Sequence, residues 1–164
     1  MFRRLWLNLC TGWFRLSRWF PKAGMRAIRD AIAEGERSHA GELCFAVEAR
    51  YSPLALWAGL TPRRRAEQLF SALRVWDTAD NSGVLLYLQL AERRVEIVAD
   101  RGIAARVPAA EWQALTTAFA EDMHNGEPDR AVLACLGRIN ALLALHFPAP
   151  ADNPRELPDE PVVL

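Results

Sequence analysis

The chain has 164 residues, which is enough for one domain with a single hydrophobic core. Hydrophobic residues make up 51% of it and charged residues 24%, and the formal net charge is zero. This composition is ordinary for a soluble α/β protein, and it argues against nucleic-acid binding, which needs a basic field. The zero hides an asymmetry, because residues 1–22 carry a charge of +5 without any acid and the rest of the chain carries −5.

Residues 1–22 have the pattern of a basic amphipathic helix. On one helix they separate an apolar stripe from a polar, basic stripe. The apolar stripe is Phe2, Leu5, Trp6, Leu9, Trp13, Leu16 and Phe20, and the polar stripe is Arg4, Asn8, Thr11, Arg15, Arg18 and Lys22. A Trp/Phe/Leu face opposite a basic face is typical of helices that lie in a membrane interface. We therefore expect this segment to bind an anionic membrane surface.

Two other interpretations of this segment remain. The apolar stripe could pack against the domain or a partner protein. The segment could also be a signal peptide, although its uncharged run is only residues 5–14 and is followed by further basic residues instead of a cleavage site. The three cysteines, Cys10, Cys44 and Cys135, form no C-x-x-C pair, and such an odd set favours a reducing compartment. We expect a cytoplasmic protein, peripheral on the inner membrane face if the segment binds lipid.

Residues 23–147 alternate between helical and strand patterns. The predicted helices are 25–37, 62–76, 112–123 and 128–147, the predicted strands are 42–49, 84–90 and 95–99, and 51–60 is an apolar loop. A helix joins the first two strands, which predicts a parallel right-handed crossover, and the last two strands form a hairpin. Strand 84–90 is apolar on both faces, so it is central. These patterns predict a three-layer α/β/α sandwich with a small mixed sheet. The proline-rich tail, residues 148–164, is expected to be extended or disordered.

Polar residues gather at one predicted edge of the sheet. The first two strands begin at this edge and the third ends there, so their flanking loops should meet. The residues concerned are Glu42, Asp77, Asp80, Asn81 and Asp100. Carboxylate and amide oxygens suit hard cations such as Ca²⁺ or Mg²⁺. The alternative is that Asp and Asn stand there only because turns favour them.

Residues 75–102 also resemble a known family. The acid-flanked Asn-x-Gly-Val-Leu-Leu strand, the Arg-Val-Glu-Ile-Val strand and the Asp-Arg-Gly-Ile loop are similar to the TPM domain family. The resemblance runs from about Met25 to Phe147, and the closing tail resembles a bacterial stand-alone subgroup. Plant members bind metal and are weak acid phosphatases, so the resemblance implies a cation site on the acidic loops. Asp80, Asn81 and Asp100 match the family pattern best, and Asp77 and Glu42 match the bacterial subgroup.

The expected function is that of a non-catalytic, membrane-peripheral accessory protein that binds Ca²⁺, or alternatively Mg²⁺, at the acidic edge. The alternative is a weak metal-dependent acid phosphatase that uses the same edge, although the chain has no Cys-x5-Arg loop and no His-Glu-x-x-His motif. Arg101 could clamp a phosphate there or pair with nearby acids. A plain scaffold, whose acidic loop is only a turn, is the third class. The opposite edge is predicted to be a solvated face of mixed charge, and it carries Glu48, Arg50, Glu92, Arg93 and Arg94.

Overall fold

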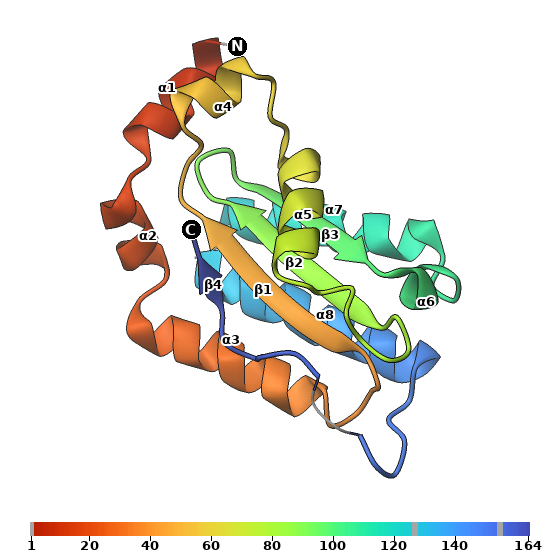
Figure 1. Cartoon of the computed structure of the whole chain (residues 1–164). Helices are drawn as coiled ribbons and strands as arrows, with labels where there is room; N and C mark the ends of the chain where they lie inside the picture. Colours follow the sequence, from red (N-terminus) through yellow and green to blue (C-terminus); the bar gives the residue numbers. More distant parts are fainter. Residues whose placement is uncertain (1, 126–127, 154–155) are drawn as a thin grey trace.

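The computed structural model describes residues 2–125, 128–153 and 156–164, and within them a mixed sheet of four strands lies between two layers of helices (Figure 1). The strands are β1 (Glu42–Glu48), β2 (Gly83–Gln89), β3 (Arg94–Ala99) and β4 (Val162–Val163), in the order β3-β2-β1-β4. β1 pairs with β2 in parallel and β2 with β3 antiparallel. The predicted sandwich, with β2 at its centre, is confirmed.

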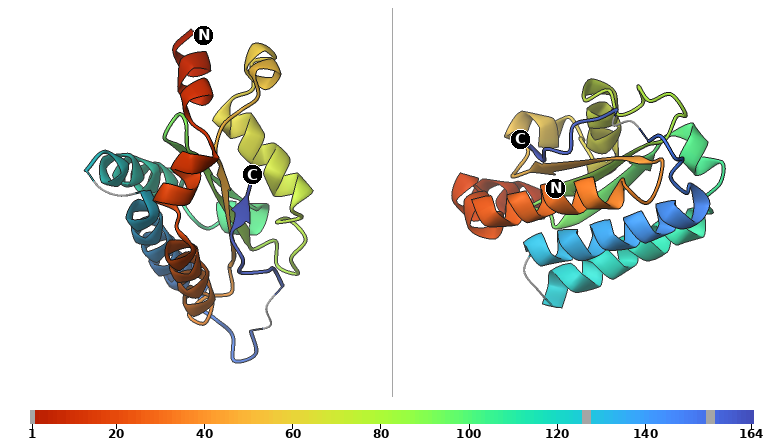
Figure 2. Two further views of the ribbon diagram at one scale, coloured as in Figure 1. Left: turned by 90° about the vertical axis from the view of Figure 1, so that its left-hand side faces the viewer. Right: turned by 90° about the horizontal axis from the view of Figure 1, so that it is seen from below.

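The helices divide between the two faces of the sheet. Helices α3 (Lys22–Gly35), α7 (Ala109–Asn125) and α8 (Pro128–His146) cover one face, and α5 (Pro62–Ala72) covers the other (Figure 2). The alternation of side chains along β1 explains this division. Leu43, Phe45 and Val47 are buried under α3 and α8, whereas Cys44 and Ala46 are buried with residues of α5.

Local signals account for three departures from the predicted elements. The predicted loop 51–60 contains α4 (Pro53–Trp57), which Ser52 caps by accepting a hydrogen bond from the Ala55 amide. α6 (Arg101–Ala104) follows β3 directly, and Asp100 is its cap. α5 ends at Ala72 instead of continuing to residue 76, and the chain turns at Arg74, whose φ is 56°.

The prediction of one continuous helix over residues 1–22 was wrong. The structure has α1 (Phe2–Cys10) and α2 (Trp13–Trp19), which are separated at Thr11 and Gly12. Thr11 is completely buried although it was assigned to the polar stripe, and Gly12 has an extended backbone. The two helices therefore cannot present one continuous stripe. The side chain of Trp13 lies outside the described part of the structure.

The last residues of the tail also differ from the prediction. Val162 and Val163 form β4 beside Ala46 and Val47 of β1, and the Leu164 amide donates to the Val47 carbonyl at 2.9 Å. The rest of the described tail contains no helix or strand, in keeping with its prolines, of which Pro154 is outside the described residues. The tail thus covers the edge of β1.

A close backbone approach at the start of β2 gives a first prediction. A Cβ atom on Gly83 would lie 1.8 Å from the Val75 carbonyl oxygen, so Gly83→Ala should lower the free energy of unfolding by about 2–3 kcal/mol. Gly137 of α8 has open space around it, and Gly137→Ala should instead add about 0.5–1 kcal/mol. Urea unfolding of both variants checks this, and equal stability of the two would contradict the close approach.

Candidate functional site

The loops before β2 and after β3 meet at the predicted acidic edge. The Asp100 amide donates to the Gly83 carbonyl at 2.8 Å, and the Gly102 amide donates to the Asn81 carbonyl at 3.1 Å. A Cβ atom on Gly102 would lie 2.4 Å from the Asp80 carbonyl oxygen and 2.7 Å from that of Asn81. The structure therefore brings together the loops that carry Asp80, Asn81 and Asp100, as the hairpin logic predicted.

The Asp100 carboxylate has one satisfied and one unsatisfied oxygen. Oδ1 accepts a hydrogen bond from the Arg101 amide at 2.7 Å, whereas Oδ2 is shielded from solvent and has no hydrogen-bond partner. Asn81 has a left-handed backbone with φ of 52°, which Asn tolerates, and its Oδ1 accepts from Arg101 Nε at 2.8 Å. A shielded carboxylate oxygen without a donor is costly unless a proton or a cation approaches it.

Asp77 and Glu42 have other partners. Asp77 forms an ion pair with Arg74 in its own turn, and Glu42 is buried, with its Oε2 accepting from the Leu157 amide at 3.0 Å. Within the described ranges, no group of three or more His, Cys, Asp or Glu side chains is arranged to hold a metal ion. A cation at this edge would therefore rely on two carboxylates together with amide or carbonyl oxygens.

Glu42 lies near a second buried acid, Glu36, which sequence reasoning missed. Burial raises the pKa of Glu36 to about 8, and the charges of Glu42 and Asp159 add to the effect. Its Oε1 accepts from the Leu43 amide at 2.9 Å, while Oε2 is shielded from solvent, and the Asp159 side chain lies within hydrogen-bonding reach of this carboxyl group. Burial also raises the pKa of Glu42. The sequence gives no signal for this pair, because Glu36 follows α3 and meets β1 only in the folded chain.

The other end of the sheet holds α1 by its polar side. Asn8 is buried, and its Oδ1 accepts from the Tyr51 amide at 2.7 Å and from Gln89 Nε2 at 3.1 Å. Arg4 forms an ion pair with Glu92 at 2.9 Å. The polar stripe of α1 therefore faces the domain, which is the reverse of the usual arrangement of a surface helix.

The apolar side of α1 is left in solvent. The exposed fractions of Phe2, Trp6 and Leu9 are 90%, 68% and 55%. α4 lies beside α1 and adds two more exposed side chains, Leu54 and Trp57 (Figure 1). We call these five residues the apolar crest. Sequence reasoning missed the contribution of α4, although Ser-Pro at residues 52–53 is the same helix-start signal as Thr-Pro at residues 61–62.

The prediction that the charged residues at this end form a solvated face was wrong for two acids, Glu92 and Glu48. Glu92 pairs with Arg4, and Glu48 is buried, with 9% exposed. Arg65 of α5 binds both carboxylate oxygens of Glu48, at 2.8 and 3.2 Å, and the Tyr87 hydroxyl donates to Glu48 Oε2 at 2.7 Å. The Tyr51 and Tyr87 hydroxyls are 3.0 Å apart. The sequence did offer a signal for this buried acid, because Glu48 is a single acid at the end of an apolar strand pattern.

These features define a small mixed α/β domain with acidic loops at one end of its sheet and an apolar crest at the other. A family model described as the TPM domain matches residues 18–142. The chain therefore belongs to the TPM domain family, as its sequence resemblance implied.

The fold is similar to a solved structure, the NMR structure of the BA42 protein from the psychrophilic bacterium Bizionia argentinensis sp. nov.. The TM-score is 0.77 and the identity is 24%, over 86% of this chain and 92% of that chain. A comparison with curated proteins found no match. Among the described helices, none is long and apolar enough to cross a membrane.

The raised pKa of Glu36 predicts a dependence of stability on pH. Its folded pKa of about 8 lies above the ordinary value of 4.5, so the native state binds more protons than the unfolded chain between these values. The free energy of unfolding should therefore fall as pH rises through this window, by at most about 1.4 kcal/mol per pH unit. Glu36→Gln keeps the acceptor for the Leu43 amide but does not titrate, so it should remove this contribution.

Urea unfolding between about pH 5 and pH 9 measures the effect. The matched control is Glu34→Gln, which removes an exposed acid that pairs with Arg37 one turn away. We expect the control to keep the slope of the unmodified protein. A Glu36→Gln slope equal to that of the control would show that the buried acid does not hold a proton.

Proposed function

We propose that the protein is a non-catalytic accessory protein that lies on an anionic membrane surface and binds a divalent cation at the acidic loops. One observation carries the membrane contact: α1 uses Asn8 and Arg4 to contact the domain and leaves Trp6 and Leu9 in solvent. Contiguous exposed apolar surface of this kind is rare on soluble monomers and marks a surface that another phase or molecule covers.

The charge distribution supports a membrane as the covering phase. Exposed arginines accompany the crest and the adjoining helix α2, namely Arg3, Arg15, Arg18 and Arg50. Each basic residue near an anionic bilayer contributes about 1 kcal/mol of attraction. The acidic loops lie at the opposite end of β1 and β2, since Glu42 is paired with Gly83 where both strands begin. This end-to-end separation would hold the negative charge away from the lipid.

The cation part of the proposal concerns Asp80, Asn81 and Asp100. The unpartnered Asp100 Oδ2 and the carbonyl oxygens of Asp80 and Asn81, which lie beside Gly102, are hard oxygen donors, which suit Ca²⁺ in the first place and Mg²⁺ in the second. A bound cation would supply the positive charge that this oxygen lacks. We assign Asp77 and Glu42 no direct role, because each already has a partner.

The phosphatase alternative would use the same loops, and one contact speaks against it. Arg101 is the basic side chain beside these acids, and its Nε already donates to Asn81 Oδ1. A phosphate would have to compete with that hydrogen bond and with the Asp100 charge. The cellular setting we propose is the inner membrane face, in keeping with three free cysteines, of which Cys44 and Cys135 are buried.

The membrane contact predicts that Trp6 is needed for vesicle binding. Trp6→Ser removes apolar area that would enter the interface and should weaken partitioning onto anionic vesicles about tenfold or more. Trp76→Ser is the matched control, because Trp76 is also exposed, at 47%, but lies near the acidic loops. Flotation with phosphatidylglycerol-containing vesicles measures both variants. Equal flotation of the two, or none by the unmodified protein, would contradict the proposed contact.

The cation site predicts a thermal shift that depends on Asp100. Millimolar Ca²⁺ should raise the unfolding midpoint, since a ligand bound only to the native state adds about 1.4 kcal/mol at tenfold its Kd. Asp100→Asn and Asp80→Asn should abolish the shift. Asp77→Asn should retain it, because the Asp77 carboxylate is occupied by Arg74. If Ca²⁺ still raises the midpoint of Asp100→Asn, the cation binds at another site. If Ca²⁺ raises the midpoint of neither the unmodified protein nor any variant, cation binding is rejected.

A further inference from the structure

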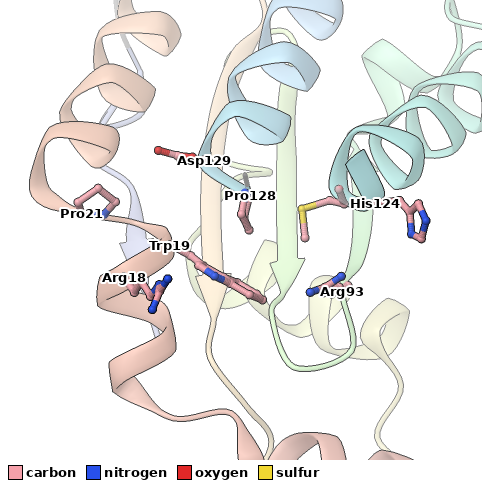
Figure 3. Close-up of a pocket in the computed structure, with 8 residues that line it drawn as sticks. Arg18, Trp19, Pro21, Arg93, His124, Pro128 and Asp129 are labelled. Atoms are coloured by element: carbon pink, nitrogen blue, oxygen red, sulfur yellow. The ribbon is translucent and has the colours of Figure 1, made fainter. Parts of the chain in front are cut away.

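A cavity of about 450 Å³ opens between α2, the turn that joins β2 to β3, and the facing ends of α7 and α8 (Figure 3). It lies beside the carboxyl end of β2, the region in which open α/β sheets usually bind ligands. Its wall includes Arg18, Trp19, Arg93, His124 and Asp129. The cavity is separate from both the acidic loops and the apolar crest.

Two guanidinium groups lie on this wall, those of Arg18 and Arg93. The side chains of Arg18 and Arg93 form no hydrogen bond and no ion pair within the part of the chain that the structure describes. The Arg93 guanidinium lies over the Trp19 ring at 5.3 Å from its centroid. Stacking of this kind uses the face of the guanidinium, so its N–H donors in the plane stay free to bind an oxyanion.

Among the described residues, the acid on the wall is Asp129, which lies at the start of α8. Asp129 Oδ1 accepts a hydrogen bond from the Arg130 amide at 2.9 Å, and its Oδ2 approaches Gly24 of α3. Figure 3 shows this carboxylate on the α3 side of the cavity, across Pro128 from Arg93. Arg15 adds a further positive charge nearby, 5.2 Å from the Trp19 centroid. Among the described residues, the cavity thus combines an excess of positive charge with a partly buried aromatic ring.

We propose that this cavity binds a phosphate-bearing anion, whose phosphate oxygens accept from Arg93 and from Arg18, on either side of the Trp19 ring (Figure 3). A carboxylate has only two oxygens and one negative charge, which is enough for one guanidinium group. A phosphate dianion has more oxygens and two negative charges, so it suits two guanidinium groups better. Trp19 and Met123 offer apolar surface to the rest of the ligand. Arg18 is also one of the arginines beside the proposed membrane contact, whereas Arg93 is not, so Arg93 separates this site from that contact and from the cation site.

The first test is calorimetric titration of the full chain with inorganic phosphate. Arg18→Gln and Arg93→Gln should each weaken binding about tenfold or more, the usual effect of losing a charge-assisted hydrogen bond. Arg64→Gln is the matched control, since Arg64 is exposed on α5 at the other face of the sheet. Thermal unfolding of each variant verifies that it is folded. Phosphate binding that is unaffected by both cavity substitutions overturns the proposal.

A second arm distinguishes a soluble phosphate compound from a lipid headgroup. Flotation with phosphatidylcholine vesicles containing phosphatidic acid is measured for Arg18→Gln, Arg93→Gln and a control, Arg3→Gln, which removes an exposed basic residue of α1 outside the cavity. If inorganic phosphate does not bind but the cavity variants float much less than the control, the ligand is a headgroup phosphate. If all three variants float alike and phosphate does not bind, the cavity is not an anion site, whereas the proposed membrane contact through Trp6 stands.

Discussion

The buried carboxylate of Glu48 is the charge on which the arrangement of the carboxyl end of the sheet depends. An unpaired carboxylate inside a protein is strongly destabilising, so its neighbours must be placed to satisfy it. Arg65 does this from α5 with two hydrogen bonds, and Tyr87 does it from β2. The Tyr87 hydroxyl in turn meets that of Tyr51, and the Tyr51 amide requires an acceptor, which Asn8 provides. A helix that meets this requirement must turn its polar side inward.

This constraint explains why the N-terminal segment and the domain form one unit with two different ends. α1 is bound through hydrogen bonds and an ion pair, and its apolar side remains outside with that of α4. The parallel register of β1 and β2 places the acidic loops at the far end of the same strands. The proposed membrane contact and the proposed cation site would therefore be held apart by the length of the sheet, and α2 with its arginines would lie beside the lipid-facing end.

Local patterns were sufficient for most of the fold and for part of the site. The apolar run of β2, the alternation of β3 and the turn between them predicted the hairpin, and the hairpin predicted that Asp80, Asn81 and Asp100 would meet. Asp77 and Glu42 could not be resolved in this way. Asp77 was captured by Arg74 three residues away, and Glu42 by a backbone amide of the tail. Which partner an acidic side chain binds depends on the folded positions of all its neighbours, and the sequence pattern does not give these positions.

Three features depended on contacts between distant parts of the chain. The break between α1 and α2 includes Thr11, which is buried although a helical projection assigns it to solvent. The closing strand β4 exists because β1 offers it an unpaired edge, and two valines give no signal by themselves. The buried Glu36 belongs to an amphipathic helix pattern whose end is covered by the tail, where Asn153 donates to the Glu36 and His39 carbonyls.

The orientation of α1 is tested most directly by hydroxyl-radical footprinting of the full chain, read by mass spectrometry, with and without anionic vesicles. In the free protein we expect Trp6 to be oxidised readily, because 68% of it is exposed, and we expect vesicles to protect it. Trp76, near the acidic loops, should be oxidised to the same extent in both conditions. Slow oxidation of Trp6 in the free protein would contradict the docking of α1 through its polar side, and equal oxidation with vesicles would contradict the membrane contact.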